Sequence, residues 1–119
     1  MSDEFEHPIC EQLRQHALTL PETSEGTSCV NRAFKARKKN FVFVGEPKGQ
    51  IRVMLKLGPS LEQAAALNDP RIGVGKTGWV TILFGPDEPV ELAQLQAWIV
   101  ESYRTLAPKT LVKVLDAQG

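Results

Sequence analysis

Ile51-Arg52-Val53-Met54-Leu55-Lys56-Leu57 is the stretch of sequence that decides the fold. Its odd-numbered positions are all branched apolar residues, whereas Arg52, Met54 and Lys56 hold the even-numbered positions. Successive side chains of a β-strand point to opposite faces, so this alternation predicts a strand with one face against a core and the other in solvent. Because two of the three outward side chains are cations, we expect a sheet whose wet face is basic.

Two consecutive β-hairpins are predicted to contain this strand. Residues 29–37 and 41–44 have the composition of strands and flank the charged turn Lys38-Lys39-Asn40. A loop over residues 45–50, which holds two glycines and a proline, then leads into the strand at residues 51–57. Both hairpins therefore bring basic residues to the sheet.

A helix and a loop are predicted before the hairpins. Apolar residues at helical spacing indicate a helix over residues 8–20, with Pro8 in its first turn and Pro21 ending it. Residues 21–28 hold several turn formers and no periodic apolar residue. We therefore expect an ordered loop that leads into the sheet.

Two helices are predicted after the hairpins. The first covers residues 61–67, with Ser60 as its N-cap and Gln63 as the capping-box partner of that serine. The second covers residues 88–106, with Asp87 as its N-cap and an apolar stripe that faces the core.

Two further strands are predicted between these helices. They cover residues 72–74 and 79–84, and the turn Gly75-Lys76-Thr77-Gly78 joins them. Alternation in the second strand points Val80 and its alternate neighbours to the core, which leaves Trp79 on the outer face.

The predicted order is helix, three strands, helix, two strands, helix, with one or two short helical turns over residues 109–115. An antiparallel sheet with its helices on one face buries every apolar stripe in two layers, so the predicted fold class is α+β. The chain has 119 residues and shows no repeat, low-complexity segment or internal boundary. A single domain over residues 1–119 is therefore expected.

The formal net charge is zero, but the charges are unevenly distributed along the sequence. Residues 30–80 hold ten basic and three acidic residues, and the rest of the chain holds four basic and eleven acidic ones. The molecule should therefore have a basic and an acidic side. Such asymmetry can steer a polyanion to one surface, and it is equally typical of a solvated sheet that faces acidic helices.

The sequence also indicates where the protein is located. No apolar run is long enough to span a membrane, so no membrane partner is expected. The acidic start lacks the basic and apolar regions of a signal peptide, which predicts a cytoplasmic protein. In a reducing cytosol, Cys10 and Cys29 are expected as free thiols rather than as a disulfide.

Motifs for catalysis or cofactor binding are weak. One segment, Gly73-Val74-Gly75-Lys76-Thr77-Gly78, has the sequence pattern of a dinucleotide-binding fingerprint. That fingerprint requires a helix to begin within it, whereas this segment precedes a strand. A hairpin turn with a basic tip is therefore the better interpretation. The residues His7, Cys10, His16 and Cys29 lack the spacing of a zinc site. We therefore predict no metal, no cofactor and no enzymatic activity, with a general-acid role for Glu25 left open.

Several segments form a pattern when they are taken together. They are Leu20-Pro21-Glu22, Glu25-Gly26-Thr27-Ser28, Ala33-Phe34-Lys35-Ala36-Arg37-Lys38-Lys39-Asn40-Phe41, the strand that begins at Trp79, and Leu106-Ala107-Pro108-Lys109. In this order and spacing they resemble the MmcQ/YjbR family, long catalogued as a domain of unknown function. The resemblance covers the chain from about Glu11 to Leu115.

The resemblance has implications for fold and function. It implies an α-β3-α-β2-α fold of the secretion-chaperone-like type, in agreement with the order predicted from the residues. It also implies a DNA-binding protein with a double-wing arrangement, a function that rests on analogy between folds. It supplies no catalytic residue.

The leading hypothesis is a DNA-binding protein whose hairpins lay cations along phosphates while Trp79 stacks on bases or sugars. The predicted nucleic-acid-binding residues are Arg32, Lys35, Arg37, Lys38, Lys39, Lys48, Arg52, Lys56, Lys76 and Trp79. The hypothesis requires that the hairpin tips and the basic strand residues form one surface.

Two alternatives remain open at the level of sequence. Trp79, Met54 and Leu83 would form an apolar patch on the outer sheet face, which is typical of a module that binds a protein or peptide partner or a second copy of itself. An enzyme or a small-ligand protein is the remaining possibility, and it would show a closed pocket with converging polar groups.

Overall fold

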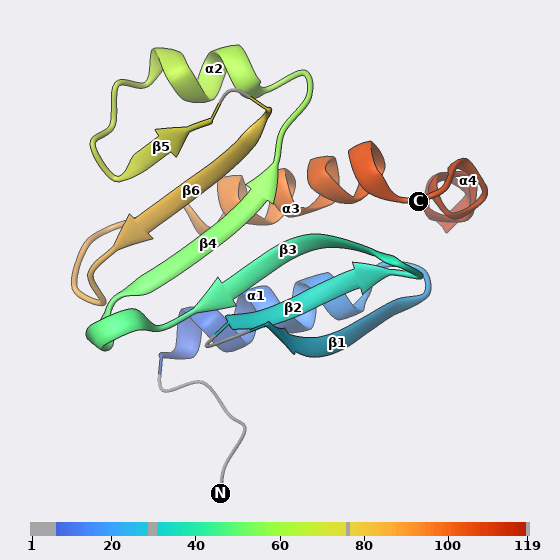
Figure 1. Cartoon of the computed structure of the whole chain (residues 1–119), viewed down its shortest axis with the longest axis horizontal. Helices are drawn as coiled ribbons and strands as arrows, with labels where there is room; N and C mark the ends of the chain where they lie inside the picture. The colour runs from blue at the N-terminus through green and yellow to red at the C-terminus, as the bar shows by residue number, and fades with distance from the viewer. Residues whose placement is uncertain (1–6, 29–30, 76, 119) are drawn as a thin grey trace, which may run out of the picture.

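The computed structural model describes residues 7–28, 31–75 and 77–118. Within these residues the chain forms a six-stranded antiparallel sheet and four α-helices, which confirms the α+β class (Figure 1). The elements are α1 (Pro8–Leu18), β1 (Thr23–Ser28), β2 (Asn31–Ala36), β3 (Lys39–Gly45), the 3-10 turn η1 (Pro47–Gly49), β4 (Ile51–Lys56), α2 (Leu61–Ala66), β5 (Ile72–Val74), β6 (Trp79–Phe84), α3 (Leu92–Leu106) and α4 (Lys109–Gln118). The strand order is β1-β2-β3-β4-β6-β5.

The central strand β4 has the two faces that its alternation predicts. Ile51, Val53 and Leu55 are fully buried, whereas the intervening residues are only partly buried. Helices α1 and α3 pack on the inner face of the sheet, while α2 lies against β5 and α4 packs on the end of α3 (Figure 1). No helix among the described residues packs on the outer face of the central strands (Figure 1).

Strand β1 replaces the loop that was predicted over residues 21–28, and that prediction is wrong. The strand Thr23–Ser28 pairs antiparallel with β2 at the edge of the sheet. The sequence does not predict this strand, because its residues are all polar or glycine and show no alternation of apolar and polar positions. Its Glu25 side chain lies on the helix side, where Arg14 of α1 donates to it at 2.8 Å.

A β-bulge in β3 decides which of its side chains face outward. Phe34 pairs with Val42, but Lys35 pairs with Asn40, so Phe41 is the extra residue. Phe41 and Val42 are consequently both fully buried on the helix side. Phe43 then points to the outer face.

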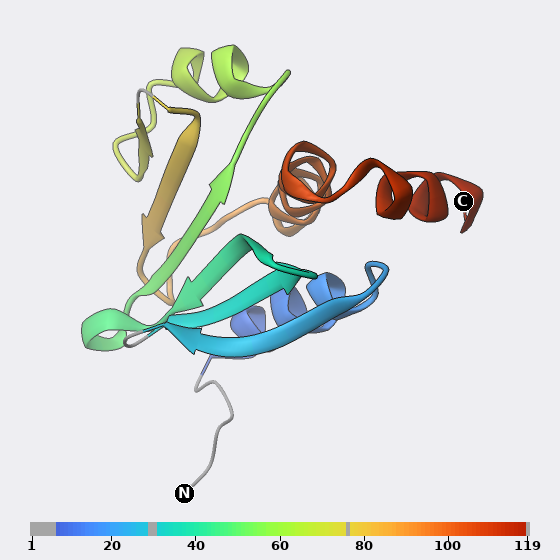
Figure 2. The same cartoon turned by 45° about the vertical axis from the view of Figure 1, so that its right-hand side comes forward.

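The sheet divides where the Ser102 side chain of α3 lies between β3 and β4. Beyond the pair of Val42 and Leu55, the buried Ser102 hydroxyl accepts from the backbone N–H of Lys56 and donates to the carbonyl of Phe41. This hydroxyl takes the place of a direct β3–β4 hydrogen bond. Beyond it the two halves of the sheet diverge, with α3 between them (Figure 2). We call β1, β2 and β3 the first wing, and β4, β6 and β5 the second wing.

The predicted capping box of α2 does not form. Ser60 precedes the helix, but its side chain makes no capping hydrogen bond. Instead, the Glu101 carboxylate of α3 accepts from the N–H groups of Gly58 and Ser60 at 3.0 and 2.9 Å and from the Ser60 hydroxyl at 2.6 Å. A carboxylate distant in sequence therefore holds the start of α2.

Helix α3 begins at Leu92 rather than at residue 88, and Asp87 does not cap it. The residues before it are held in a loop, because the guanidinium of Arg71 donates to the carbonyl of Pro89 at 2.9 Å. Farther along α3, Trp98 is 2% exposed and belongs to the core.

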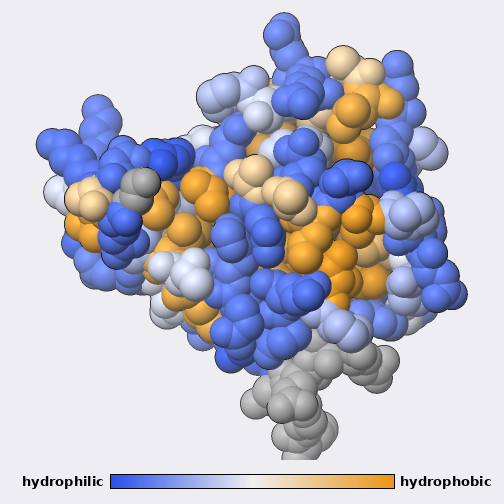
Figure 3. Space-filling model, turned by 180° about the vertical axis from the view of Figure 1, so that it is seen from behind, coloured by the Kyte–Doolittle hydropathy of each residue, from blue (hydrophilic) through white to orange (hydrophobic). Residues whose placement is uncertain are grey.

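The helix side carries a small apolar cavity. Seen from behind, apolar surface gathers over the middle of this side between polar stretches (Figure 3). A cavity of about 120 Å³ lies between β5, β6 and α3, and Ile72, Ile82, Leu95 and Trp98 are among its lining residues.

None of the described helices has the length and apolar character needed to cross a membrane.

Candidate nucleic-acid interface

Strand pairing sorts the predicted site residues between the two ends of the sheet. Successive turns of an antiparallel meander lie at opposite ends, and the pairs Ala36–Lys39 and Lys56–Trp79 mark the same end. We call this the lysine end, and it comprises Lys35, Arg37, Lys38, Lys39, Lys56 and Trp79. Lys48 and Arg52 lie at the opposite end of the sheet, and Lys76 lies outside the described residues.

The lysine end extends around the tip of the first wing. Lys35 is exposed on the outer face of β2. Lys39 pairs with Ala36, which is fully buried on the helix side, so the exposed Lys39 lies toward the junction of α3 and α4. In the second wing, Lys56 lies beside Trp79 on the outer face. The cations therefore do not form the single surface that the DNA hypothesis requires. Arg52 lies at the other end of the sheet, and the lysine end itself spans two wings that diverge (Figure 2).

Arg32 is not part of this surface. It pairs with Val44, whose side chain is buried on the helix side, and its guanidinium lies 3.5 Å from the Glu25 carboxylate. In β2 the residues with even numbers face the helices, so Arg32 shares a face with Phe34. Its ion pair is thus part of the link between the first wing and α1.

Arginines and lysines have different roles in this protein. Arginine side chains form ion pairs with carboxylates at Arg14, Arg32, Arg37, Arg71 and Arg104, and Arg52 donates to the Asn31 side chain at 2.9 Å. In the part of the chain that the structure describes, no ion pair involves Lys35, Lys38, Lys39, Lys48 or Lys56. The lysines are therefore the cations available to an external anion.

An apolar strip crosses the outer face next to Lys56. The rings of Phe43 and Trp79 lie 5.9 Å apart at 50°, and Met54 pairs with Phe43 across the strands. Leu83 continues the strip and is 38% exposed. We call Phe43, Met54, Trp79 and Leu83 the outer strip. Such a surface can stack on sugars and bases or can be buried against a protein.

The candidate catalytic groups lie away from the lysine end. Cys10 is a free, fully buried thiol, and burial, together with the negative charge of Glu46, raises its pKa to about 12. That thiol is protonated at neutral pH and is a poor nucleophile and metal ligand. Burial lowers the pKa of His16 on α1. Cys29 lies outside the described residues, among which no group of acidic, histidine or cysteine side chains could hold a metal ion.

The glycine-rich segment that resembles a dinucleotide fingerprint is a hairpin connection. Gly75 donates to the carbonyl of Trp79 at 2.8 Å, and β6 follows directly. The interpretation as a hairpin turn is confirmed, since the segment opens no helix.

The structure adds to the candidate site two residues that the sequence did not predict. Phe43 was missed because residues 41–44 are apolar throughout, so only the bulge decides which side chain faces outward. Lys109 begins α4 and lies with Lys38 and Lys39 around one groove. No sequence period connects residue 109 to the hairpin, so only the tertiary fold identifies it.

Comparison with known protein families gives a match over most of the chain. The family model described as YjbR matches residues 18–105, which include both wings and nearly all of α3. No curated protein matches the chain. The matched residues contain the whole lysine end and the outer strip.

Proposed function

The chain belongs to the YjbR family, and we propose that it binds double-stranded DNA by placing the lysine end against the phosphate backbone. One observation carries the proposal. Among the described residues, the arginines are committed to contacts within the protein, whereas the lysines at the wing ends have no ion pair. Free ammonium groups at protruding strand ends are suited to phosphates.

A net charge of zero is compatible with this function. Salt bridges hold several acidic side chains, among them Glu25, Asp69 and Asp116, against arginines elsewhere in the fold. The local field at the lysine end is therefore positive although the whole chain is neutral. Four phosphate contacts, from Lys35, Lys38, Lys39 and Lys56, would give a salt dependence of slope about −3.6 in log K against log salt concentration.

The test is the salt dependence of duplex binding by the variant Lys38→Gln/Lys39→Gln. We expect the slope to become shallower by about 2 because two phosphate contacts are lost, and affinity at low salt to fall. Fluorescence anisotropy of a labelled duplex at several salt concentrations measures both quantities.

Lys48→Gln/Lys113→Gln is the control matched in charge, because both lysines are exposed and neither belongs to the lysine end. Its slope should equal that of the wild type. Absence of duplex binding by the wild type at low salt, or equal slopes for all proteins, would contradict the proposal.

The outer strip supports a second candidate function. Its apolar side chains from β3, β4 and β6 lie on a face that no helix of the described residues covers, which is typical of a surface for a protein partner or for self-association. With either function, we propose a cytoplasmic and non-enzymatic protein. Burial keeps the thiol of Cys10 protonated, so this cysteine does not supply a nucleophile.

A further inference from the structure

A groove lies between the tip of the first wing and the junction of α3 with α4. Its volume is about 420 Å³. We call it the elbow groove, and its lining residues are Ala36, Arg37, Lys38, Lys39, Thr105, Leu106, Ala107, Pro108 and Lys109. Residues more than sixty positions apart in sequence thus meet at one concave site.

The lining of the elbow groove has cations and apolar groups but no acidic residue. Lys38, Lys39 and Lys109 are exposed and, in the part of the chain that the structure describes, form no ion pair. Leu106 and Pro108 supply apolar surface beside them. This composition is complementary to a small molecule that joins an anionic group to an organic body.

The volume of the elbow groove and the positive charge of its lining residues restrict the class of ligand that it can bind. A duplex is far wider than this groove, whereas ligand sites typically have about 300–1,000 Å³. A phosphomonoester carries nearly two negative charges and three acceptor oxygens at neutral pH, so it can engage several ammonium groups at once. Lys109 also lies at the start of the ten-residue helix α4, whose first N–H groups add positive potential.

We propose that the elbow groove binds a phosphomonoester, with its terminal phosphate among Lys38, Lys39 and Lys109 and its organic part against Leu106 and Pro108. The phosphate belongs to either a free nucleotide or the 5′ end of a DNA strand. The site goes beyond the proposed function, because a free nucleotide would bind even if the protein bound no duplex.

An ion pair holds the turn at the rim of the elbow groove. Arg37 adopts a φ of 58° and Glu22 a φ of 50°, although neither is glycine. The two side chains pair at 3.0 Å, and this contact lowers the pKa of Glu22 and raises that of Arg37. The pair fixes the turn that carries Lys38 and Lys39.

Calorimetric titration with adenosine 5′-monophosphate, adenosine and inorganic phosphate tests the site at low salt. We expect the monophosphate to bind and adenosine to bind at least about tenfold more weakly, since it lacks the charged group. Lys39→Gln/Lys109→Gln should weaken monophosphate binding by about tenfold or more. Lys48→Gln/Lys113→Gln removes the same charge at two exposed lysines that do not line the groove, and it should retain wild-type affinity.

The outcomes separate the elbow groove from general basicity. Equal binding of adenosine and its monophosphate, equal losses in both double variants, or inorganic phosphate binding as tightly as the monophosphate would overturn the proposal of an organic phosphate site. Far-ultraviolet circular dichroism of each variant establishes that the fold is retained, which is expected because all four lysines are at least partly exposed.

A second arm identifies the source of the phosphate. Duplexes with 5′-phosphate and with 5′-hydroxyl ends are compared in competition with the monophosphate. A preference for phosphorylated ends that Lys109→Gln abolishes assigns the site to DNA termini. Monophosphate binding without such a preference assigns it to a free nucleotide, and no response to either phosphate overturns the proposal. Failure of duplex binding alone rejects the proposed function and leaves the nucleotide result standing.

Discussion

Ser102 is the residue on which the two-wing shape depends. Its hydroxyl satisfies two backbone groups of different strands, Lys56 N–H and Phe41 C=O, and it is fully buried. Ser102→Ala would leave a buried donor and a buried acceptor unpaired. We expect the free energy of unfolding to fall by about 1–3 kcal/mol, measured by urea denaturation.

Thr105→Ala is the control for Ser102→Ala. Thr105 lies on the same helix and loses the same hydroxyl, but it is exposed and donates only to the carbonyl of Glu101 within its own helix. We expect this variant to change the free energy of unfolding by less than about 0.5 kcal/mol. Similar values for the two variants would show that the inserted hydroxyl has no special role.

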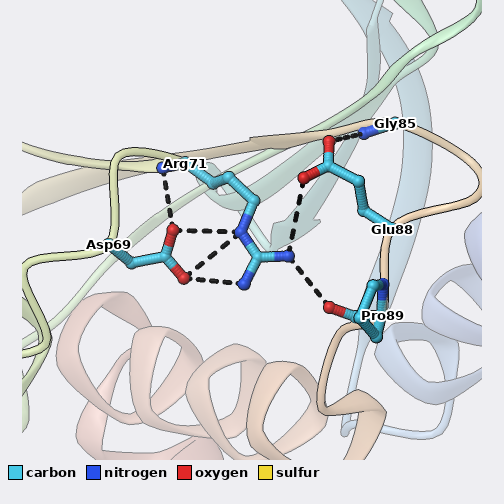
Figure 4. A network of polar contacts seen from close by, with 5 residues as sticks. All are labelled: Asp69, Arg71, Gly85, Glu88 and Pro89. Carbon is cyan, nitrogen blue, oxygen red and sulfur yellow. Dashed lines mark hydrogen bonds and ion pairs between the residues drawn. The ribbon is translucent and has the colours of Figure 1, made fainter.

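At the scale of elements, a polar network fixes the approach to α3 (Figure 4). The guanidinium of Arg71 pairs with Asp69 through bonds of 2.7 and 3.0 Å and reaches Pro89 on the other side. Glu88 in turn accepts from the N–H of Gly85 at 2.7 Å. The network joins the loop before β5 to the loop after β6, beside the small apolar cavity.

The acid dependence of stability should report this network. Hydrogen bonds from Arg71 lower the pKa of Asp69 from 3.8 to about 2. Because the folded pKa lies below the unfolded one, the pair stabilises the fold above pH about 3.8 and loses this contribution as the pH falls toward about 2. In Asp69→Asn the contribution is absent at every pH. Denaturant unfolding of both proteins should therefore give a difference in stability that shrinks across this interval.

Both proteins contain every other carboxylate, so the contributions of those groups cancel in the comparison. A difference that stays constant from neutral pH to pH about 2 would contradict the role of Asp69.

The elements predicted correctly from the sequence are those with one buried face. β4, β6 and α3 bury regular apolar stripes, so periodicity reveals them. β1 is polar because it lies at an edge, and Glu101 replaces the local cap of α2 from 41 positions away, so neither leaves a local signal. Among the site residues, basic hairpins were predictable. The sequence could not predict which of these basic residues lie at which end of the sheet, because that depends on the strand order and on the bulge at Phe41.

At the scale of the whole molecule, two surfaces compete as the functional one. The lysine end favours DNA, and the outer strip favours a protein partner or a second copy of the chain. Trp79 belongs to both surfaces, because it lies beside Lys56 and in ring contact with Phe43. The other tryptophan, Trp98, is buried in the core. The chain therefore contains one reporter at the candidate interface and one internal reference.

Single-tryptophan variants can decide between these surfaces. In Trp98→Phe only Trp79 emits, and we expect added duplex to change its fluorescence because a phosphate bound at Lys56 alters the surroundings of the indole. In Trp79→Phe only the buried Trp98 emits, and its fluorescence should stay unchanged with duplex. If the outer strip mediates self-association instead, Trp79 emission will shift on dilution of the protein without DNA, and light scattering will show a dimer that dissociates over the same concentrations. If Trp79 emission responds to neither duplex nor dilution, the second wing takes part in neither DNA binding nor self-association. The tip of the first wing, with Lys38 and Lys39, would then be the remaining contact for DNA.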